Sequence, residues 1–253
     1  MRRRLLSDGQ IGKYLKYAFG EIILVVLGIL IALSANNYNE RSKALAQSSA
    51  YLNDMMEDLA ADTLYLSRML PALEAKLQLE EWLLNKTTFD ETDLDSIQLA
   101  VSYLDWTFNM HDRSYQSVQN SSEAKLLGYE QLYREASKYY ISTQERINQN
   151  NQIELQQGSQ SNDFEDVMQA NLLITTRAYQ DYSGFQVKLD LPTQDVVKDF
   201  EAIKSSLGEI RTRNTLNEEF ARHNYIYITL YFCDIEAKKL MQLIQSAIKG
   251  KSL

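Results

Sequence analysis

The residues that could carry chemistry are few and widely spaced. The chain has two histidines, His111 and His223, and one cysteine, Cys233. Glu219 and His223 are four residues apart and would share one helix face, but two ligands are too few for a zinc site. His111 precedes Asp112 at an expected helix end, with no serine or cysteine nucleophile placed nearby by a recognisable turn. We therefore expect no enzymatic activity, no cofactor and no metal site.

Motifs that would indicate a different chemistry are missing from the sequence. There is no phosphate-binding glycine loop and no dinucleotide fingerprint. A single cysteine can form neither an intramolecular disulfide nor a thiolate zinc cluster. We expect Cys233 to be a small, buried apolar residue.

Four carboxylates are clustered within one predicted long helix, at Asp54, Glu57, Asp58 and Asp62. We place them on the solvent-facing side of that helix, where a charged cluster is simply hydrated. Binding of a divalent cation is the alternative interpretation.

Tyrosine is abundant, with sixteen residues. Tyr129, Tyr133 and Tyr140 share one helix face, and Tyr227 and Tyr231 share another. Such amphipathic rings either form core with their hydroxyls at the edge, or form an exposed recognition patch for a protein or a glycan. The five tyrosines are the candidate recognition patch of this protein.

The composition indicates an all-α protein. Only two prolines and nine glycines occur in 253 residues, so long stretches lack a helix breaker. The net charge of -8 is unevenly distributed. Residues 1–43 carry seven basic and three acidic side chains, whereas the remainder carries 19 basic and 31 acidic ones. The remainder is therefore too acidic for us to expect binding to nucleic acid.

An apolar segment near the amino terminus predicts a transmembrane helix. The nineteen residues from Tyr17 to Ala35 contain one charged residue, Glu21, and would span about 28 Å as a helix. A cleaved signal peptide, with its site near Ala32-Leu33-Ser34, is one alternative. A buried core helix is the other, although so uniformly apolar a surface is unusual in a soluble helix.

The distribution of basic residues predicts the topology of the chain in a bacterial inner membrane. Five basic side chains precede the apolar segment, which favours a cytoplasmic amino terminus. The expected organisation is a cytoplasmic segment over residues 1–16, a transmembrane helix over 17–35 and a periplasmic helical domain over 36–253.

Small residues within the predicted span could support association between membrane helices. Gly20 and the pair Gly28 and Ala32 would allow close approach of a second helix. Glu21 lies near the cytoplasmic boundary, where it either reaches the headgroups or contributes to this association; proton handling is a third interpretation. We assign membrane-helix association to Gly20, Glu21, Gly28 and Ala32.

Helical periodicity continues beyond the span. The absence of glycine and proline between Gly28 and Pro71 predicts that the membrane helix continues without a break to residue 70. Pro71 suits the first turn of a new helix, so we expect a kink there and a second helix ending near Leu84. A loop should follow over 85–93, with Asp93 or Asp95 capping the next helix.

The remaining helices are expected at 94–104, 113–121, 128–157, 162–180 and 207–248. The amide-rich stretch 148–161 is interpreted as an exposed helix end and loop, and 182–191 as a loop. Thr193 is placed to cap a helix that begins after Pro192. The two long terminal helices are expected to pack antiparallel in a bundle.

Two stretches resemble a family of uncharacterised bacterial envelope proteins with one N-terminal transmembrane helix. Residues 13–43, KYLKYAFGEIILVVLGILIALSANNYNERSK, contain the Gly-Glu pair that opens the span and the asparagine-rich segment that closes it. Residues 113–140 are similar to two later helices of that family. Tyr38 stands where the family pattern has tryptophan. The resemblance implies an inner-membrane anchor and a helical periplasmic domain, and no known activity.

These features lead us to expect a membrane-tethered periplasmic binding or scaffold protein that forms homo-oligomers. Its expected partners are the lipid bilayer and other envelope membrane proteins. The alternative is a ligand sensor or an accessory subunit of an envelope transport complex.

Overall fold

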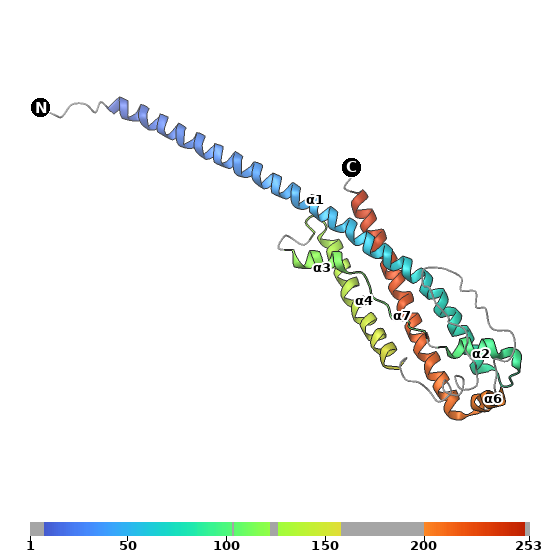
Figure 1. The fold of residues 1–253 in the computed structure, drawn as a ribbon. Coiled ribbons are helices and arrows are strands. Elements are labelled where there is room, and N and C mark those ends of the chain that lie inside the picture. Colours follow the sequence, from blue (N-terminus) through green and yellow to red (C-terminus); the bar gives the residue numbers. More distant parts are fainter. Residues whose placement is uncertain (1–7, 103, 122–125, 158–199, 251–253) are drawn as a thin grey trace.

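The fold is known from a computed structural model that describes residues 8–102, 104–121, 126–157 and 200–250 (Figure 1). The elements expected at 162–180 and 182–191, and the cap at Thr193, lie outside the described residues. Within the described ranges every regular element is helical, which confirms the all-helical class. The elements are α1 (Asp8–Asn85), η1 (Glu91–Asp93), α2 (Leu94–Val101), α3 (Arg113–Asn120), α4 (Glu130–Gln157), α6 (Phe200–Gly208) and α7 (Ile210–Lys249).

Helix α1 is the backbone of the structure and has two unlike halves. Its 78 residues form one uninterrupted helix, about 117 Å long. Every described side chain from Tyr14 to Lys43 is exposed, and Ser48 is the first buried residue. Figure 1 shows the first half projecting alone, whereas the other helices are grouped around the second half. The predicted continuity of this helix beyond residue 35 is confirmed. Its passage through a membrane stays a prediction.

The separate second helix expected to begin at Pro71 is wrong, because α1 continues through this residue to Asn85; the expected kink stays a prediction. Pro71 is exposed, while Leu70 and Leu73 on either side are buried in the core. Proline removes one backbone hydrogen bond inside a helix and costs about 3 kcal/mol. Burial of a leucine side chain contributes about 2 kcal/mol, so the flanking packing offsets that cost.

The main core lies between the second half of α1 and helices α3, α4 and α7. Its buried side chains from α1 recur in steps of three, four or seven, as the sequence predicts. They are Leu52, Met55, Leu59, Leu66, Met69, Leu70 and Leu73. From α7 come Ile226, Leu230, Cys233, Ala237, Leu240 and Ile244. The expected burial of Cys233 is therefore confirmed, and burial raises the pKa of its thiol to about 11.

A second, smaller core closes the far end of α1 and contains Leu83, Ile97, Ala100, Ile203, Leu207 and Leu216. The Arg213 guanidinium donates to the carbonyls of Leu83 (3.0 Å) and Leu84, which satisfies acceptors left open where α1 ends. The start of α7 is thereby fixed to the end of α1, and Figure 1 shows the other end of α7 beside the middle of α1.

The C-terminal helix differs from its expected course. A single helix from Leu207 was predicted, but α6 ends at Gly208 and α7 begins at Ile210, with Glu209 extended between them. Ile210 is 80 % exposed because it starts the new helix outside the core.

The loop after α1 is shaped by two aspartates. Asp90 accepts from the Thr92 backbone N–H at 2.9 Å and forms a capping box with Asp93. Asp93 occupies the N-cap position of α2 as predicted, but its carboxylate accepts from the Asp90 backbone and from Lys86 instead of capping α2. The Asp93 carboxylate is thus used within the local turn, and α2 has no side-chain N-cap.

Replacing Pro71 with alanine should stabilise the protein, because alanine restores the missing helix hydrogen bond on an exposed face. We expect Pro71→Ala to raise the free energy of unfolding by about 1–3 kcal/mol. The measurement is denaturant unfolding of the detergent-solubilised chain, with Ala72→Gly, which should lower stability by about 1 kcal/mol, as a control. A destabilised Pro71→Ala variant would show that the ring is required by the core.

Candidate functional site

A connecting segment, not a helix, fills one side of the main core. We call residues 104–112, which join α2 to α3, the crossing segment. Trp106, Phe108 and Met110 are buried, whereas Asp105 is exposed. Alternate side chains therefore face the core, as in an extended strand. Unlike a strand, this segment has no neighbouring strand in the described structure to satisfy its backbone.

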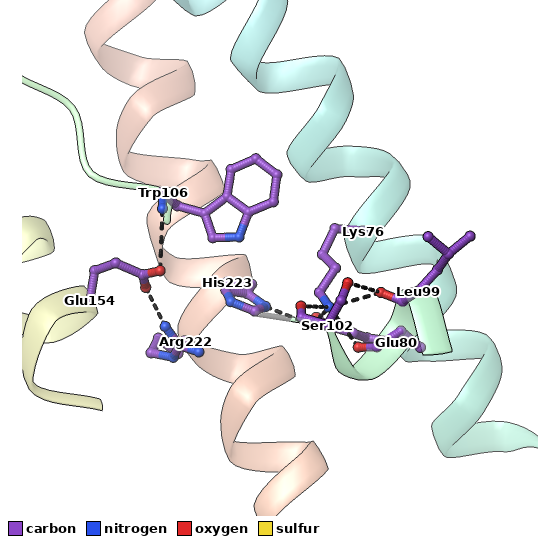
Figure 2. Close-up of polar contacts among 9 residues, drawn as sticks. Lys76, Glu80, Leu99, Ser102, Trp106, Glu154, Arg222 and His223 are labelled. Atoms are coloured by element: carbon purple, nitrogen blue, oxygen red, sulfur yellow. Dashed lines mark hydrogen bonds and ion pairs between the residues drawn. The ribbon is translucent and has the colours of Figure 1, made fainter. Parts of the chain in front are cut away.

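Polar side chains of α4 satisfy that backbone. The Asn151 carbonyl oxygen accepts from the Phe108 N–H at 3.0 Å, and its amide donates to the Phe108 carbonyl at 2.8 Å. Glu154 accepts from the Trp106 N–H at 3.2 Å (Figure 2). The described part of 148–161 is a helix end, as expected, but it is not exposed throughout, since Asn150 and Glu154 are buried within α4.

The carboxylates of α1 hold the end of the crossing segment. Asp62 accepts from the His111 backbone N–H at 3.0 and 3.1 Å, and the His111 ring Nδ1 lies 2.6 Å from the same carboxylate. Asp58 accepts from the Ser114 N–H in the first turn of α3 at 2.9 Å. The assignment of Asp62 to the solvent-facing side is wrong: its side chain is 1 % exposed, because it replaces water as the acceptor for this turn.

Lys76 of α1 holds the chain at the other end, where α2 leads toward the crossing segment. Its ammonium group donates to the carbonyls of Leu99 (3.1 Å), Ala100 (2.7 Å) and Ser102 (2.7 Å), as Figure 2 shows. These are carbonyls at the C-terminus of α2, where a positive charge is favourable. The buried lysine thus serves as the C-terminal cap of a neighbouring helix.

Glu80 and His223 connect α1 to α7 next to this lysine. The Glu80 carboxylate lies 3.6 Å from the Lys76 ammonium group and 2.7 Å from Nδ1 of His223. An ionised carboxylate can only accept, so this contact is satisfied by the tautomer that carries its proton on Nδ1. Both side chains are buried, which makes this contact a fixed link between the two long helices.

Arg222, the neighbour of His223, connects α7 to α4 in the same way. Its guanidinium pairs with the second carboxylate oxygen of Glu154, and the two side chains are 5 % and 0 % exposed. Glu154 therefore bridges a charge on α7 and a backbone N–H of the crossing segment. Figure 2 shows this pair on the opposite side of α7 from Lys76.

We call this group of ionisable residues the buried charge cluster: Lys76, Glu80, Glu154, Glu219, Arg222 and His223. Burial lowers the pKa of Lys76, although Glu80 and Glu219 partly oppose this effect. Burial raises the pKa of the half-buried Glu219, against the attraction of Lys76 and Arg222. In both cases removal from water is the larger influence, which disfavours the charged form.

The chemistry available to this cluster is limited by its enclosure. Nε2 of His223 and one carboxylate oxygen of Glu80 are buried and have no hydrogen-bond partner in the described structure. A histidine oriented by a carboxylate can act as a general base. His223 and Glu80 are, however, only 4 % and 3 % exposed, so this base faces no opening for a substrate. The arrangement is suited to holding α1, α4 and α7 in one fixed register.

A surface pocket lies at the far end of the bundle and has a volume of about 420 Å³. Lys86, Lys204 and Arg213 contribute its positive charges. Each already has an acceptor, since the lysines pair with Asp93 and Glu201, and Arg213 bonds carbonyls of α1. The described residues contain no group of three side chains arranged as metal ligands.

Tyr129, just before α4, and Tyr140 on α4 lie in the main core, and Tyr133 packs against it. Tyr140 is 2 % exposed and stacks on Tyr115 with ring centroids 4.6 Å apart. Tyr129 is 7 % exposed and its hydroxyl lies 3.2 Å from that of Ser49 on α1. The Tyr133 hydroxyl accepts from Gln119 at 3.0 Å. Tyr129 and Tyr140 therefore cannot present an open surface in this conformation.

Tyr227 and Tyr231 lie on α7 and stack on each other, with centroids 6.1 Å apart. Tyr231 is 46 % exposed. The structure therefore does not bring the five tyrosines together into one surface. The role of any of them in recognition stays a prediction.

The residues assigned to membrane-helix association all lie on the bare half of α1. Gly20, Glu21, Gly28 and Ala32 are exposed, and a Cβ added at either glycine would have no atom within 4 Å. The apolar part of α1 is long and apolar enough to cross a membrane, and none of it is buried. A signal sequence passes the same test of length and composition. The association itself stays a prediction.

The sequence did not indicate most of the buried charge cluster. Glu219 and His223 were recognised only as a pair on one helix face, while Lys76, Glu80, Glu154 and Arg222 were not singled out. One signal was available: Lys76 and Glu80 occur in the middle of a stretch whose spacing places them with Leu73 and Leu83 on the apolar face.

Breaking the Arg222–Glu154 pair should be costly. We expect Arg222→Met to lower the free energy of unfolding by about 3–5 kcal/mol, because Glu154 is left buried without its counter-charge. Adding Glu154→Gln removes that charge and keeps an oxygen for the Trp106 N–H, so the double variant should regain more than half of the loss. Denaturant unfolding measures both. The exposed pair Arg146–Glu236 is the control, where Arg146→Met should cost less than about 1 kcal/mol. A double variant as unstable as the single one would contradict this account.

The stability of the chain should depend on the pH through Glu219. Because the pKa of Glu219 is raised in the folded state, the folded protein binds this proton more tightly than the unfolded chain does. Relative to Glu219→Gln, the wild type should therefore gain stability as the pH falls from 7 toward 4.5, and lose it as the pH rises through the folded pKa. Unfolding of both proteins at pH 7 and pH 5 measures the difference, which would be zero or reversed if the carboxylate were well solvated.

One comparison with known proteins gives a match. Residues 21–127, which run from Glu21 within the apolar segment to beyond α3, match the model of a family of unknown function (DUF6090). This similarity covers less than half of the chain and agrees with the resemblance to an uncharacterised family. No curated protein and no solved structure matches the chain.

Proposed function

We propose that this protein is a single-pass bacterial inner-membrane protein whose periplasmic, antiparallel helical bundle binds or scaffolds other envelope components. The observation that carries this proposal is the two-part character of α1. Its first half is an apolar helix with no protein around it, and the same unbroken helix forms one wall of the bundle.

The exposed first half supports insertion into lipid. In water, an apolar helical surface extending from Ile22 to Leu33 would be strongly unfavourable, at about 25 cal/mol for each Å². In a bilayer the same surface is solvated, and the helix satisfies its own backbone groups. The basic residues before the span favour a cytoplasmic amino terminus and a periplasmic bundle.

The interior of the bundle supports a binding or scaffold role over catalysis. Its ionisable side chains are used to hold the crossing segment and to link helices, as Lys76 and Glu154 do. What remains for interaction is the surface of the bundle and the helix that connects it to the membrane. A stiff helical connection would keep that surface at a fixed distance from the bilayer.

Labelling of single cysteines tests the proposed topology. In a Cys233→Ala background, Lys13→Cys and Lys43→Cys place one thiol on each side of the span. In cells with a permeabilised outer membrane, an impermeant maleimide should label position 43 at once and position 13 only after lysis. Both chains should remain in carbonate-washed membranes at full length. Labelling of position 13 before lysis, or a mature chain that starts after residue 34, would overturn the proposal.

A further inference from the structure

The bare part of α1 carries a regular seam. We call this the α1 seam: Leu24, Gly28, Ile31, Ala35, Tyr38, Ser42 and Leu45. Its members follow one another in steps of four and three residues, the spacing that places side chains along one side of a helix in a two-helix coiled coil. Small residues occupy every second member and large apolar residues the others.

The α1 seam is open in the folded chain from Leu24 to Ser42, and its last member, Leu45, is half-buried. Leu24, Ile31 and Tyr38 are 73 %, 68 % and 77 % exposed, and Gly28 has open space in front of its Cα. Within the membrane, small residues on a helix face allow a second backbone to approach closely, and large residues pack beside them. A repeat of 3.5 residues gives such a pair a left-handed crossing of about 20°.

Lipid cannot cover the whole seam. Tyr38, Ser42 and Leu45 follow the proposed membrane exit at Ala35, and the bundle begins only at Ser48. The twelve residues from 36 to 47 therefore form a helical stalk about 18 Å long with almost no packing of its own. A helix of this length is marginal in water without tertiary contacts. The seam indicates where a second helix would supply them.

Two of the three charges of the stalk lie away from the α1 seam. Glu40 and Lys43 occupy positions on the outer side of the heptad, and Asn36 donates to Glu40 at 2.8 Å on that side. Arg41 lies beside Ser42 at the margin of the contact, and Glu21 continues the same spacing three residues before Leu24. Between Leu24 and Leu45, a second helix that carries the same sequence can therefore approach with no charged residue at a seam position.

We propose that the α1 seam is the interface with a second copy of this chain, forming a parallel, in-register helix pair. Two copies inserted in the same direction present the same residue at the same depth, so Gly28 meets Gly28 and Ala35 meets Ala35. The bundles are then held side by side on the periplasmic side. This inference rests on the proposed membrane crossing. It differs from association through Gly28 and Ala32, because it places Ala35 at the contact and Ala32 at its margin.

Disulfide cross-linking of the full chain in membranes tests this pairing. In the Cys233→Ala background, four single-cysteine variants form two matched pairs: Ala35→Cys with Ala32→Cys inside the span, and Ser42→Cys with Lys43→Cys in the stalk. Mild oxidation should give several-fold more covalent dimer for positions 35 and 42 than for positions 32 and 43. The reduced samples should return to monomer.

The possible failures are distinguishable. Equal yields at all four positions would indicate random collision, and the absence of dimer at 35 and 42 in carbonate-washed membranes would show that no second copy lies on the seam. More dimer at 32 than at 35 would assign the contact to the Gly28 and Ala32 face. Each of these results overturns the proposed pairing through the α1 seam and does not affect the proposed membrane anchor. Recovery of the chain in the soluble fraction would overturn both the proposed membrane anchor and the proposed pairing.

Discussion

A buried segment of chain that belongs to no helix sets the main constraint on this structure. Backbone N–H and C=O groups removed from water must find partners, and an extended segment among helices has no neighbouring strand to provide them. Here the partners are side chains of α1 and α4, chiefly Asp62, Asn151 and Glu154, while Lys76 caps the end of α2 that leads into this segment. Each of these polar groups needs compensation in turn, which explains why Glu80, Arg222 and His223 gather around them. The polar interior is thus a consequence of how the crossing segment is held.

The same helix that provides this wall of the bundle continues into a segment of opposite character. In the bundle, α1 alternates between a buried apolar face and a hydrated face, whereas from Ile22 to Leu33 it is apolar all round. One helix is therefore suited to two solvents. Because it is unbroken, no loop separates the apolar half from the bundle.

The sequence predicted the elements better than their contacts. The helical class, the continuity past residue 35 and the limits of α3 and α4 follow from spacing and from the scarcity of glycine and proline. The helix start expected at Pro71 was misjudged because a local preference was outweighed by the packing of Leu70 and Leu73. Asp62 was misjudged because its partner, the His111 backbone, is 49 residues away in sequence, where no local pattern reports it. For the same reason the links between Glu80 and His223 and between Glu154 and Arg222 could not be predicted.

The central claim is that α1 is one continuous helix that passes from lipid into water and then into the bundle. Spin labels placed one at a time from residue 17 to residue 47, in chains reconstituted in bilayers, test it through their accessibility to oxygen and to a water-soluble nickel complex. We predict high oxygen and low nickel accessibility over 17–35, a reversal beyond Ala35, and a helical period of about 3.6 residues across the whole range. High nickel accessibility throughout 17–35, or loss of the helical period between 36 and 47, would contradict the account.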